Sequence, residues 1–176
     1  MSTPSYYVDT SLIIARYKPS DELYKGSNTF FENDFNFVIS PITLVELYCV
    51  LSRVKNELDI PFQAEPMIDT LVAFMIEDCK LKLLSKSHCA KRDFAGYACR
   101  MCLEYYIATK LAGSLGLKTL DMLHLSYAWM LRKSFGINLF VTEDEEILEK
   151  AENIRKSLGI KVYNLKQAIG PKRRNL

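Results

Sequence analysis

The sequence predicts an α/β fold in which a parallel sheet is covered by helices on both faces. Short apolar stretches typical of strands alternate with stretches typical of helices along the whole chain. Strands separated by helices form parallel sheets, because each helix returns the chain to the edge where the next strand begins. The 176 residues, 49% hydrophobic and 25% charged, are ordinary for one globular domain. We therefore expect a single domain at 1–170, followed by a basic tail at 171–176.

Local signals in the first half of the chain set the limits of the expected helices. Ser40 and Pro41 are a helix cap and a first-turn proline, so a long helix follows the second strand. Gly26 weakens the short helix before that strand, and Pro61 and Pro66 interrupt the chain after the long helix. The expected elements are strands at 5–9, 35–40 and 80–85, and helices at 10–17, 21–33, 41–57 and 67–79.

The second half continues with helices that end at glycine. One long helical pattern is closed by Gly113 and Gly116, and the next has Thr119 as a cap and Gly136 as a stop. The last helix is acidic in its first turn and basic in its last turn, which suits the helix dipole. The expected elements are helices at 94–112, 119–136 and 143–159, and strands at 137–142 and 160–165.

The charge balance excludes a protein that is basic throughout. The chain has 23 Lys and Arg residues against 21 Asp and Glu, a net charge of +2. Any nucleic-acid site must therefore be a local concentration of basic residues. No apolar run is long enough to span a membrane and no signal peptide is recognisable, which indicates a cytoplasmic protein with no membrane partner.

The cysteines are expected to be thiols in that compartment. Cys99 and Cys102 form a CxxC, with Cys79, Cys89 and His88 before it. Because this CxxC falls inside a helical pattern and has no second CxxC, buried free thiols are favoured over a structural zinc site. A disulfide is the remaining alternative.

Four carboxylates converge on one edge of the predicted sheet. Asp9 ends the first strand and Asp144 follows the strand at 137–142, so both project from the carboxyl edge of a parallel sheet. Glu46 lies in the second turn of its helix, on a stripe that faces inward, and Asp121 lies in the first turn of another helix. In parallel α/β sheets, ligands bind at this edge.

Each carboxylate also has a purely structural interpretation. Asp9 and Asp144 are good helix caps, and Asp121 is an ordinary acid of a first helical turn. If Asp9 binds a ligand instead, the capping role is expected to pass to the neighbouring Thr10 or Ser11. Glu46 is harder to explain, since a buried glutamate is costly unless it binds a metal or has a basic partner such as Arg53.

Taken together, the four acids favour a metal site. They repel one another, and a divalent cation is the usual physical remedy. Oxygen ligands suit Mg²⁺ or Mn²⁺ better than zinc. A carboxylate cluster that holds such a cation typically acts on phosphate esters. No Walker A, GxGxxG or GxSxG motif is present, so neither a nucleotide cofactor nor a serine nucleophile is supported.

The acids lie in stretches that resemble a known family. These stretches are YVDTSLI, ISPITLVELYCVL, LKTLDMLHLSYA and FVTEDEEI, and they follow the family's order over nearly the whole chain. The sequence is similar to PIN domains, the small Mg²⁺-dependent ribonuclease fold found in VapC-type toxins. The resemblance implies a three-layer α/β/α sandwich with about five parallel strands, and often a homodimer. Glu143 replaces a smaller or neutral residue of the family pattern, and extra length is expected at 56–92.

The resemblance also implies an activity and assigns residues to it. It implies a Mg²⁺- or Mn²⁺-dependent endoribonuclease that hydrolyses RNA, acting as the toxin of a type II toxin–antitoxin system with a cognate antitoxin as partner. Two alternatives are a PIN-like RNA-processing or RNA-binding factor with little nuclease activity, and a phosphohydrolase acting on small molecules. His124 is expected to pack or to form hydrogen bonds rather than to act in catalysis. The assigned acids are Asp9, Glu46, Asp121 and Asp144, with Ser11 and Thr142 in support. The candidate RNA contacts are Lys18, Arg53, Lys172, Arg173 and Arg174.

Overall fold

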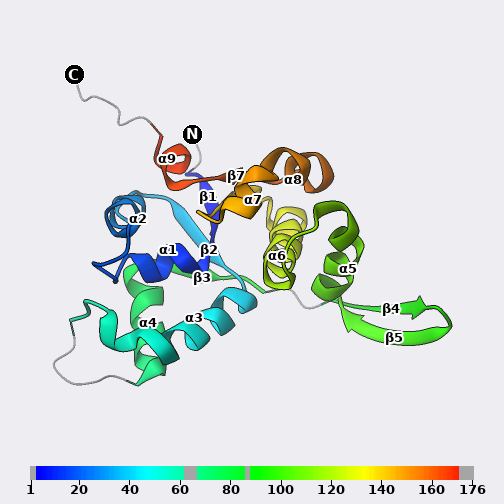
Figure 1. The fold of residues 1–176 in the computed structure, drawn as a ribbon, viewed down its shortest axis with the longest axis horizontal. Coiled ribbons are helices and arrows are strands. Elements are labelled where there is room, and N and C mark those ends of the chain that lie inside the picture. The colour runs from blue at the N-terminus through cyan, green and yellow to red at the C-terminus, as the bar shows by residue number, and fades with distance from the viewer. Residues whose placement is uncertain (1–2, 62–66, 86–87, 171–176) are drawn as a thin grey trace.

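The computed structural model describes residues 3–61, 67–85 and 88–170 of the chain. A five-stranded sheet with the order β3-β2-β1-β6-β7 lies at its centre, and every neighbouring pair in it is parallel. The predicted parallel α/β architecture and the strand number implied by the PIN resemblance are both confirmed (Figure 1). The strands of this sheet are β1 (Ser5–Val8), β2 (Asn36–Ile39), β3 (Leu81–Leu83), β6 (Leu139–Val141) and β7 (Lys161–Tyr163).

Helices cover both faces of the sheet, because successive side chains of a strand point to opposite sides. In β1, Tyr6 and Val8 belong to one buried cluster and Tyr7 belongs to the other. The first cluster is completed by α1 (Thr10–Ala15), α2 (Tyr24–Phe31), α3 (Pro41–Val54), α4 (Ile68–Asp78) and α9 (Leu165–Ile169). The second is completed by α5 (Leu103–Leu115), α6 (Thr119–Phe135), α7 (Glu145–Glu149) and α8 (Ala151–Leu158).

The predicted helix at 94–112 is wrong in its first part. An antiparallel hairpin of β4 (Cys89–Phe94) and β5 (Tyr97–Cys102) occupies this region, and α5 begins only at Leu103. The two turn residues, Ala95 and Gly96, have φ of 51° and 87°, as a tight two-residue hairpin turn requires. Cys99 and Cys102 therefore lie on a strand rather than in a helix. Figure 1 shows the hairpin projecting from the body of the molecule beside α5.

Several predicted boundaries also move. The helix at 143–159 is divided at Lys150, whose ammonium group donates to the carbonyl oxygens of Leu115 and Gly116 at 2.5 and 3.1 Å. The helix α5 runs past Gly113 to Leu115, with Gly116 as its C-cap, and the N-cap position of α6 is Lys118, which makes no side-chain capping bond, rather than Thr119. The helix α3 ends at Val54 and is followed by a 3-10 turn at Lys55–Glu57. The short helix α9 was not predicted.

Some expectations fall on residues outside this description. The tail at 171–176 lies outside the described residues, as do 62–66 and 86–87 within the segment of expected extra length. In the part of the chain that is described, none of the helices combines the length and apolar character needed to cross a membrane.

Candidate metal centre

Asp9 lies where β1 meets α1, at the carboxyl edge of the sheet. Val8 is paired with Val141, so the ends of the parallel strands β1 and β6 are side by side. Asp9 is the N-cap of α1, and its Oδ1 accepts a hydrogen bond from the backbone N–H of Ser11 at 3.3 Å. Its Oδ2 accepts from the Thr142 hydroxyl at 2.5 Å. The expectation that Thr10 or Ser11 takes over the capping role is therefore wrong, because Asp9 itself caps the helix.

Glu46 reaches the same edge from the second turn of α3. Its Oε2 accepts hydrogen bonds from His124 Nε2 at 2.6 Å and from the Thr10 hydroxyl. The basic partner of Glu46 is therefore His124, whereas Arg53 is exposed. The other ring nitrogen of His124, Nδ1, lies 2.6 Å from the hydroxyl oxygen of the buried Tyr7. This chain of hydrogen bonds fixes the position of the Glu46 carboxylate.

The pairing of Glu46 and His124 changes the acidity of both groups. Burial alone would raise the pKa of Glu46, but the hydrogen bond and charge of His124 hold it below its ordinary value. Burial alone would lower the pKa of His124, but the hydrogen bond to Glu46 and the charges of Asp9 and Glu46 raise it. Both shifts favour the ion pair, so His124 offsets part of the negative charge at this edge.

Asp121 and Asp144 approach from the other side of the site, and they are bonded differently. Asp144 is the N-cap of α7, and its Oδ1 accepts from the backbone N–H of Ile147 at 3.0 Å. Asp121 lies in the first turn of α6, and its Oδ2 is buried without a hydrogen-bond partner among the described residues. Burial, followed by the charge of Asp144, raises the pKa of Asp121. A buried carboxylate oxygen without a partner is costly, so this atom is suited to a cation.

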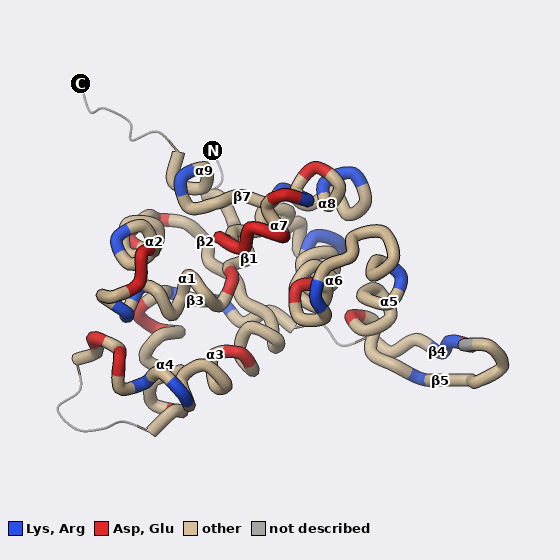
Figure 2. The backbone as a smooth tube through the Cα atoms, in the orientation of Figure 1, with Lys and Arg blue, Asp and Glu red and all other residues tan. Residues whose placement is uncertain are grey.

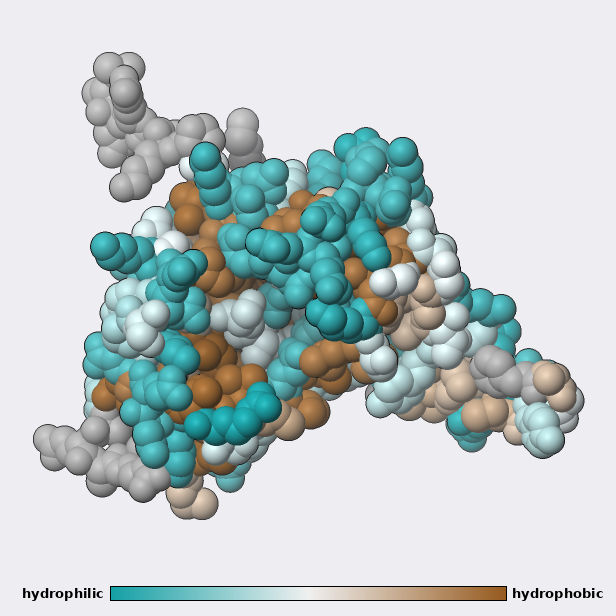
Figure 3. Space-filling view, in the orientation of Figure 1, coloured by the Kyte–Doolittle hydropathy of each residue, from teal (hydrophilic) through white to brown (hydrophobic). Residues whose placement is uncertain are grey.

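All four acids line one pocket of about 510 Å³, which we call the acidic pocket. Figure 2 shows acidic positions gathered beside β1 and α7, and Figure 3 shows that this face is hollowed near its centre. Ligand atoms of Asp9, Glu46 and His124 all lie within 4.8 Å of one another. With the unpartnered oxygen of Asp121 on the same pocket, the residues present fit a divalent cation.

The supporting residues have contacts of different kinds. The Thr142 hydroxyl bonds Asp9 and accepts from the backbone N–H of Asp144 at 3.0 Å, so it joins two of the acids. Ser11 contributes its backbone N–H to Asp9 and lines the pocket. Glu143 also lines the pocket, but one of its carboxylate oxygens accepts from the backbone N–H of Leu165 at 2.7 Å. Of the acids at 143–146, Asp144 and Glu143 therefore line the pocket.

The two candidate RNA contacts within the described residues, Lys18 and Arg53, do not line the acidic pocket. Lys18 forms an ion pair with Glu57 at 2.7 Å and lines a neighbouring hollow together with Glu143. Arg53 is exposed near the end of α3. Lys172, Arg173 and Arg174 lie outside the described residues.

Two residues of the site were not assigned to it from the sequence. His124 was expected to pack or form hydrogen bonds, and the structure confirms the hydrogen bonds, one of which is to Glu46. Its position three residues after Asp121 was a usable signal, because residues at that spacing share a helix face. Thr10, which bonds Glu46, carried no comparable signal, since a threonine after Asp9 is explained equally well by helix capping.

Comparison with known proteins defines the class of fold and then one related structure. The five parallel strands and the covering helices are a PIN-like fold. The fold is similar to a chain in the crystal structure of VapBC2 from Rickettsia felis bound to a DNA fragment from their promoter. The sequences are 13% identical, the TM-score is 0.53, and the match covers 91% of this chain and 98% of that chain. No protein-family model matches the sequence, and no match is found among curated proteins.

Proposed function

We propose that this protein is a divalent-metal-dependent endoribonuclease, which cleaves RNA phosphodiester bonds in the acidic pocket. The observation that carries the proposal is the convergence of Asp9, Glu46 and His124 within 4.8 Å, at the edge of the sheet where parallel α/β folds bind ligands. The unpartnered oxygen of Asp121 supports it, since a buried carboxylate oxygen without a hydrogen-bond partner is costly and a cation would relieve that cost.

The side chains of the pocket divide into groups that would hold a cation and groups that position them. Asp9, Asp121 and Asp144 would be the direct ligands of Mg²⁺ or Mn²⁺, and Glu46 would bind a cation or orient the attacking water. When bound, the cation would supply Lewis-acid activation of water and neutralise charge on the scissile phosphate. His124 and Thr10 hold Glu46 through hydrogen bonds, and Thr142 holds Asp9. Because these acids sit on a sheet edge and on helix starts, little reorganisation is needed when RNA binds.

We further propose that the nuclease is the toxin of a type II toxin–antitoxin pair. The support is the fold, which is similar to a chain of a VapBC2 complex that was crystallised on promoter DNA. In this proposal the cognate antitoxin is a protein partner, and the protein forms a homodimer. A short antitoxin-like reading frame immediately upstream of the gene is the simple observation that tests this part.

One observation favours a second candidate, an RNA-binding or RNA-processing factor that does not cleave. Three of the four acids already have structural partners, because Asp9 and Asp144 cap helices and Glu46 is paired with His124. Such a protein would bind RNA at this edge without a cation. The two candidates differ in whether RNA is cut.

Purified protein incubated with single-stranded and structured RNA in Mg²⁺, in Mn²⁺ and in EDTA separates these candidates. The nuclease is expected to cut RNA in either metal and not in EDTA, leaving 5′-phosphate and 3′-hydroxyl ends. Tight RNA binding without cleavage in any metal would favour the second candidate and overturn the first. Cleavage that persists in EDTA would contradict the role proposed for the acidic pocket.

A further inference from the structure

The hairpin formed by β4 and β5 contributes no described residue to the acidic pocket, so the proposed reaction gives it no role. Its strands pair only with each other, and neither buried cluster includes a residue of the hairpin among those described. It is anchored at its base, where Leu103 N–H donates to the His88 carbonyl at 2.8 Å and the Arg92 guanidinium lies 3.7 Å from the centre of the Tyr106 ring. A two-stranded hairpin that packs on the fold mainly at one helix is marginally stable in water, so a bound partner would add to its stability.

The basic side chains of the hairpin are divided between its two faces. Arg92 lies on the face that packs against α5 through Tyr106. On the other face, Lys91 and Arg100 are directly opposite each other in the strand register, and both are exposed. Like charges directly opposite in a strand pair destabilise it. Neither cation forms an ion pair with a described residue, and the nearby Asp93 accepts instead from the backbone N–H of Gly96 in the turn.

The composition of this outer face indicates what kind of partner would stabilise it. Its described positions are Cys89, Lys91, Asp93, Ala98, Arg100 and Cys102. None of these is a large apolar side chain, and protein interfaces are centred on such side chains and depleted in lysine. A pair of adjacent cations without acidic partners is instead complementary to a phosphate backbone.

We propose that the hairpin is a second RNA-binding element, in which Lys91 and Arg100 together bind the phosphate backbone of the RNA at a distance from the acidic pocket. This inference rests on the proposed function, because RNA is the polyanion that the pocket would cut. The two are connected through the fold: β5 runs into α5, α5 packs against α6, and α6 carries Asp121 in its first turn. Figure 2 shows the basic positions of the hairpin beyond α5, separated from the acidic ones at the centre.

The hairpin is suited to a substitution that separates RNA binding from stability. Lys91→Glu places an acid opposite Arg100, so it replaces a repulsive pair with an attractive one. The variant is therefore expected to keep or raise its melting temperature while it binds RNA more weakly. If Lys91 had only a structural role, the melting temperature and the RNA affinity of the variant would rise or fall together. Arg100→Gln is the companion variant, because it removes one cation without introducing an acid.

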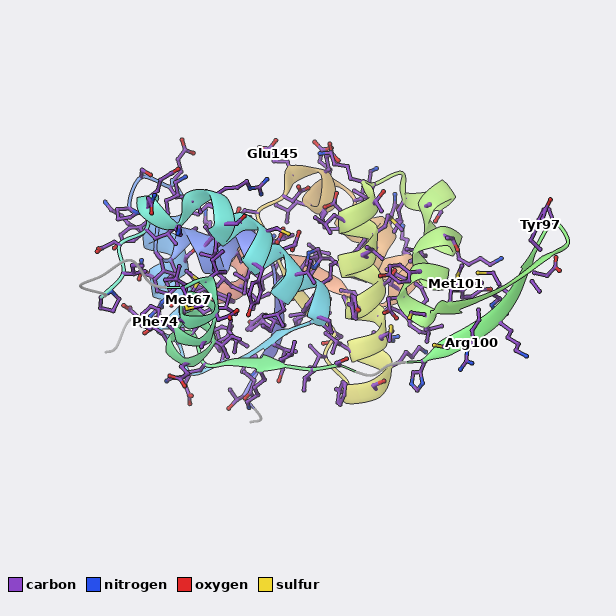
Figure 4. The ribbon with its side chains drawn as sticks, turned by 90° about the horizontal axis from the view of Figure 1, so that it is seen from below. Met67, Phe74, Tyr97, Arg100, Met101 and Glu145 are labelled. Atoms are coloured by element: carbon purple, nitrogen blue, oxygen red, sulfur yellow. The ribbon has the colours of Figure 1, made fainter. Side chains whose placement is uncertain are left out.

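Tyr97 and Lys166 supply matched controls. Figure 4 shows Tyr97 at the tip of the hairpin with its side chain directed away from the side to which Arg100 points, and Tyr97 is 79% exposed. Tyr97→Ser therefore alters the hairpin without altering its cationic face. Lys166→Glu makes the same change in net charge on α9, which lies on the far side of the fold from the hairpin (Figure 1).

The experiment measures binding of a long single-stranded RNA in EDTA at several salt concentrations, and cleavage of a short and a long RNA in Mg²⁺. Lys91→Glu and Arg100→Gln should each weaken binding of the long RNA, and Arg100→Gln should reduce the salt dependence of log K by about 0.7 for one lost phosphate contact. Cleavage of the short RNA should be unchanged, because it does not reach the hairpin. The controls should behave like the wild type.

The outcomes distinguish this inference from the proposed function. If the wild type cuts RNA but both hairpin variants bind and cut the long RNA as it does, the hairpin inference is wrong and the proposed function stands. If the variants instead change the oligomeric state at unchanged RNA affinity, the hairpin is a protein interface and the inference is also wrong. If the wild type binds RNA but cuts none, the proposed nuclease fails while the hairpin variants still report on binding. Absence of any RNA binding by the wild type would overturn both.

Discussion

The acidic pocket concentrates negative charge, whereas the β4–β5 hairpin carries two positive charges opposite each other. Contacts within the fold compensate most of the charge in the pocket but not that of the two hairpin cations. In the pocket, His124 pairs with Glu46, and the Thr142 hydroxyl and backbone N–H groups bond Asp9 and Asp144, while a buried oxygen of Asp121 has no described partner. On the hairpin, Lys91 and Arg100 face each other with no described acidic partner. The pocket is therefore preorganised for a small cation, whereas the hairpin depends on a large anion supplied from outside.

A large effect is expected from Asp121→Asn, which removes the carboxylate whose buried oxygen lacks a hydrogen-bond partner. Cleavage should fall by about a hundredfold or more, as is typical when a preorganised electrostatic group is lost. Without metal the variant should be at least as stable as the wild type, because the repulsion between Asp121 and Asp144 is relieved. Melting temperatures in EDTA and cleavage rates in Mg²⁺ check this. A variant that loses stability and keeps its cleavage activity would contradict the claim that the acidic pocket, unlike the hairpin, is preorganised for a cation.

A smaller loss is expected from His124→Ala, because His124 acts through Glu46. Removing the imidazole takes one hydrogen bond from Glu46 and one from the buried Tyr7, which leaves Glu46 with Thr10 and Tyr7 with Ser40, and costs about 1–3 kcal/mol of stability. Cleavage should fall about 10–100-fold, as for other groups that orient metal ligands. Chemical denaturation and cleavage assays measure both effects. His124→Gln, which can still donate to Glu46, is the control and should recover part of the activity.

Thr142→Val tests the hydrogen bonds that join two of the acids. The hydroxyl donates to Asp9 and accepts from Asp144 N–H, so its loss should cost about 1 kcal/mol and lower the affinity for metal. Titration of Mg²⁺ or Mn²⁺ followed by thermal unfolding measures this change. Serine at the same position keeps the hydroxyl and should restore wild-type affinity; a serine variant as weak as valine would contradict the role of the hydroxyl.

The smallest effect is expected in the hairpin turn. Ala95 has a φ of 51°, a conformation that asparagine and glycine tolerate better than alanine. Ala95→Asn should therefore stabilise the hairpin by up to about 1 kcal/mol, while the acidic pocket is unaffected. Hydrogen exchange of the hairpin amides should slow, and cleavage of a short RNA should stay at the wild-type rate. A change in that rate would show that hairpin and pocket are coupled.

The same contrast explains which parts of the structure were predictable from sequence. The pocket follows from topology: once strands alternate with helices, residues after parallel strands, such as Asp9 and Asp144, must meet at one edge. The hairpin gives a weaker signal, because its turn is Ala95-Gly96 rather than the usual Asn-Gly, and its strands contain alanine, methionine and arginine, which also suit a helix. Its sequence therefore continued the helical pattern of α5.

Contacts between side chains were predicted less well than the positions of the acids. The sequence suggested Arg53 as a partner for Glu46, since the two lie on one helix, but the actual partner, His124, comes from a helix on the other side of the pocket. Such a contact depends on how α3 and α6 approach each other, and local spacing carries no information about that. Likewise, the double role of Asp9 as cap and candidate ligand could not be resolved from the chain, because both roles favour the same residue at the same position.

The central claim is that Asp9 serves a bound cation as well as the helix it caps, and Asp9→Asn tests it most directly. Asparagine caps a helix about as well as aspartate, so the fold and its melting temperature in EDTA should be retained. In Mg²⁺ or Mn²⁺ the wild type should cut RNA and gain thermal stability, and the variant should do neither. RNA cleavage by Asp9→Asn at the wild-type rate, with a normal gain in stability on adding metal, would contradict the account.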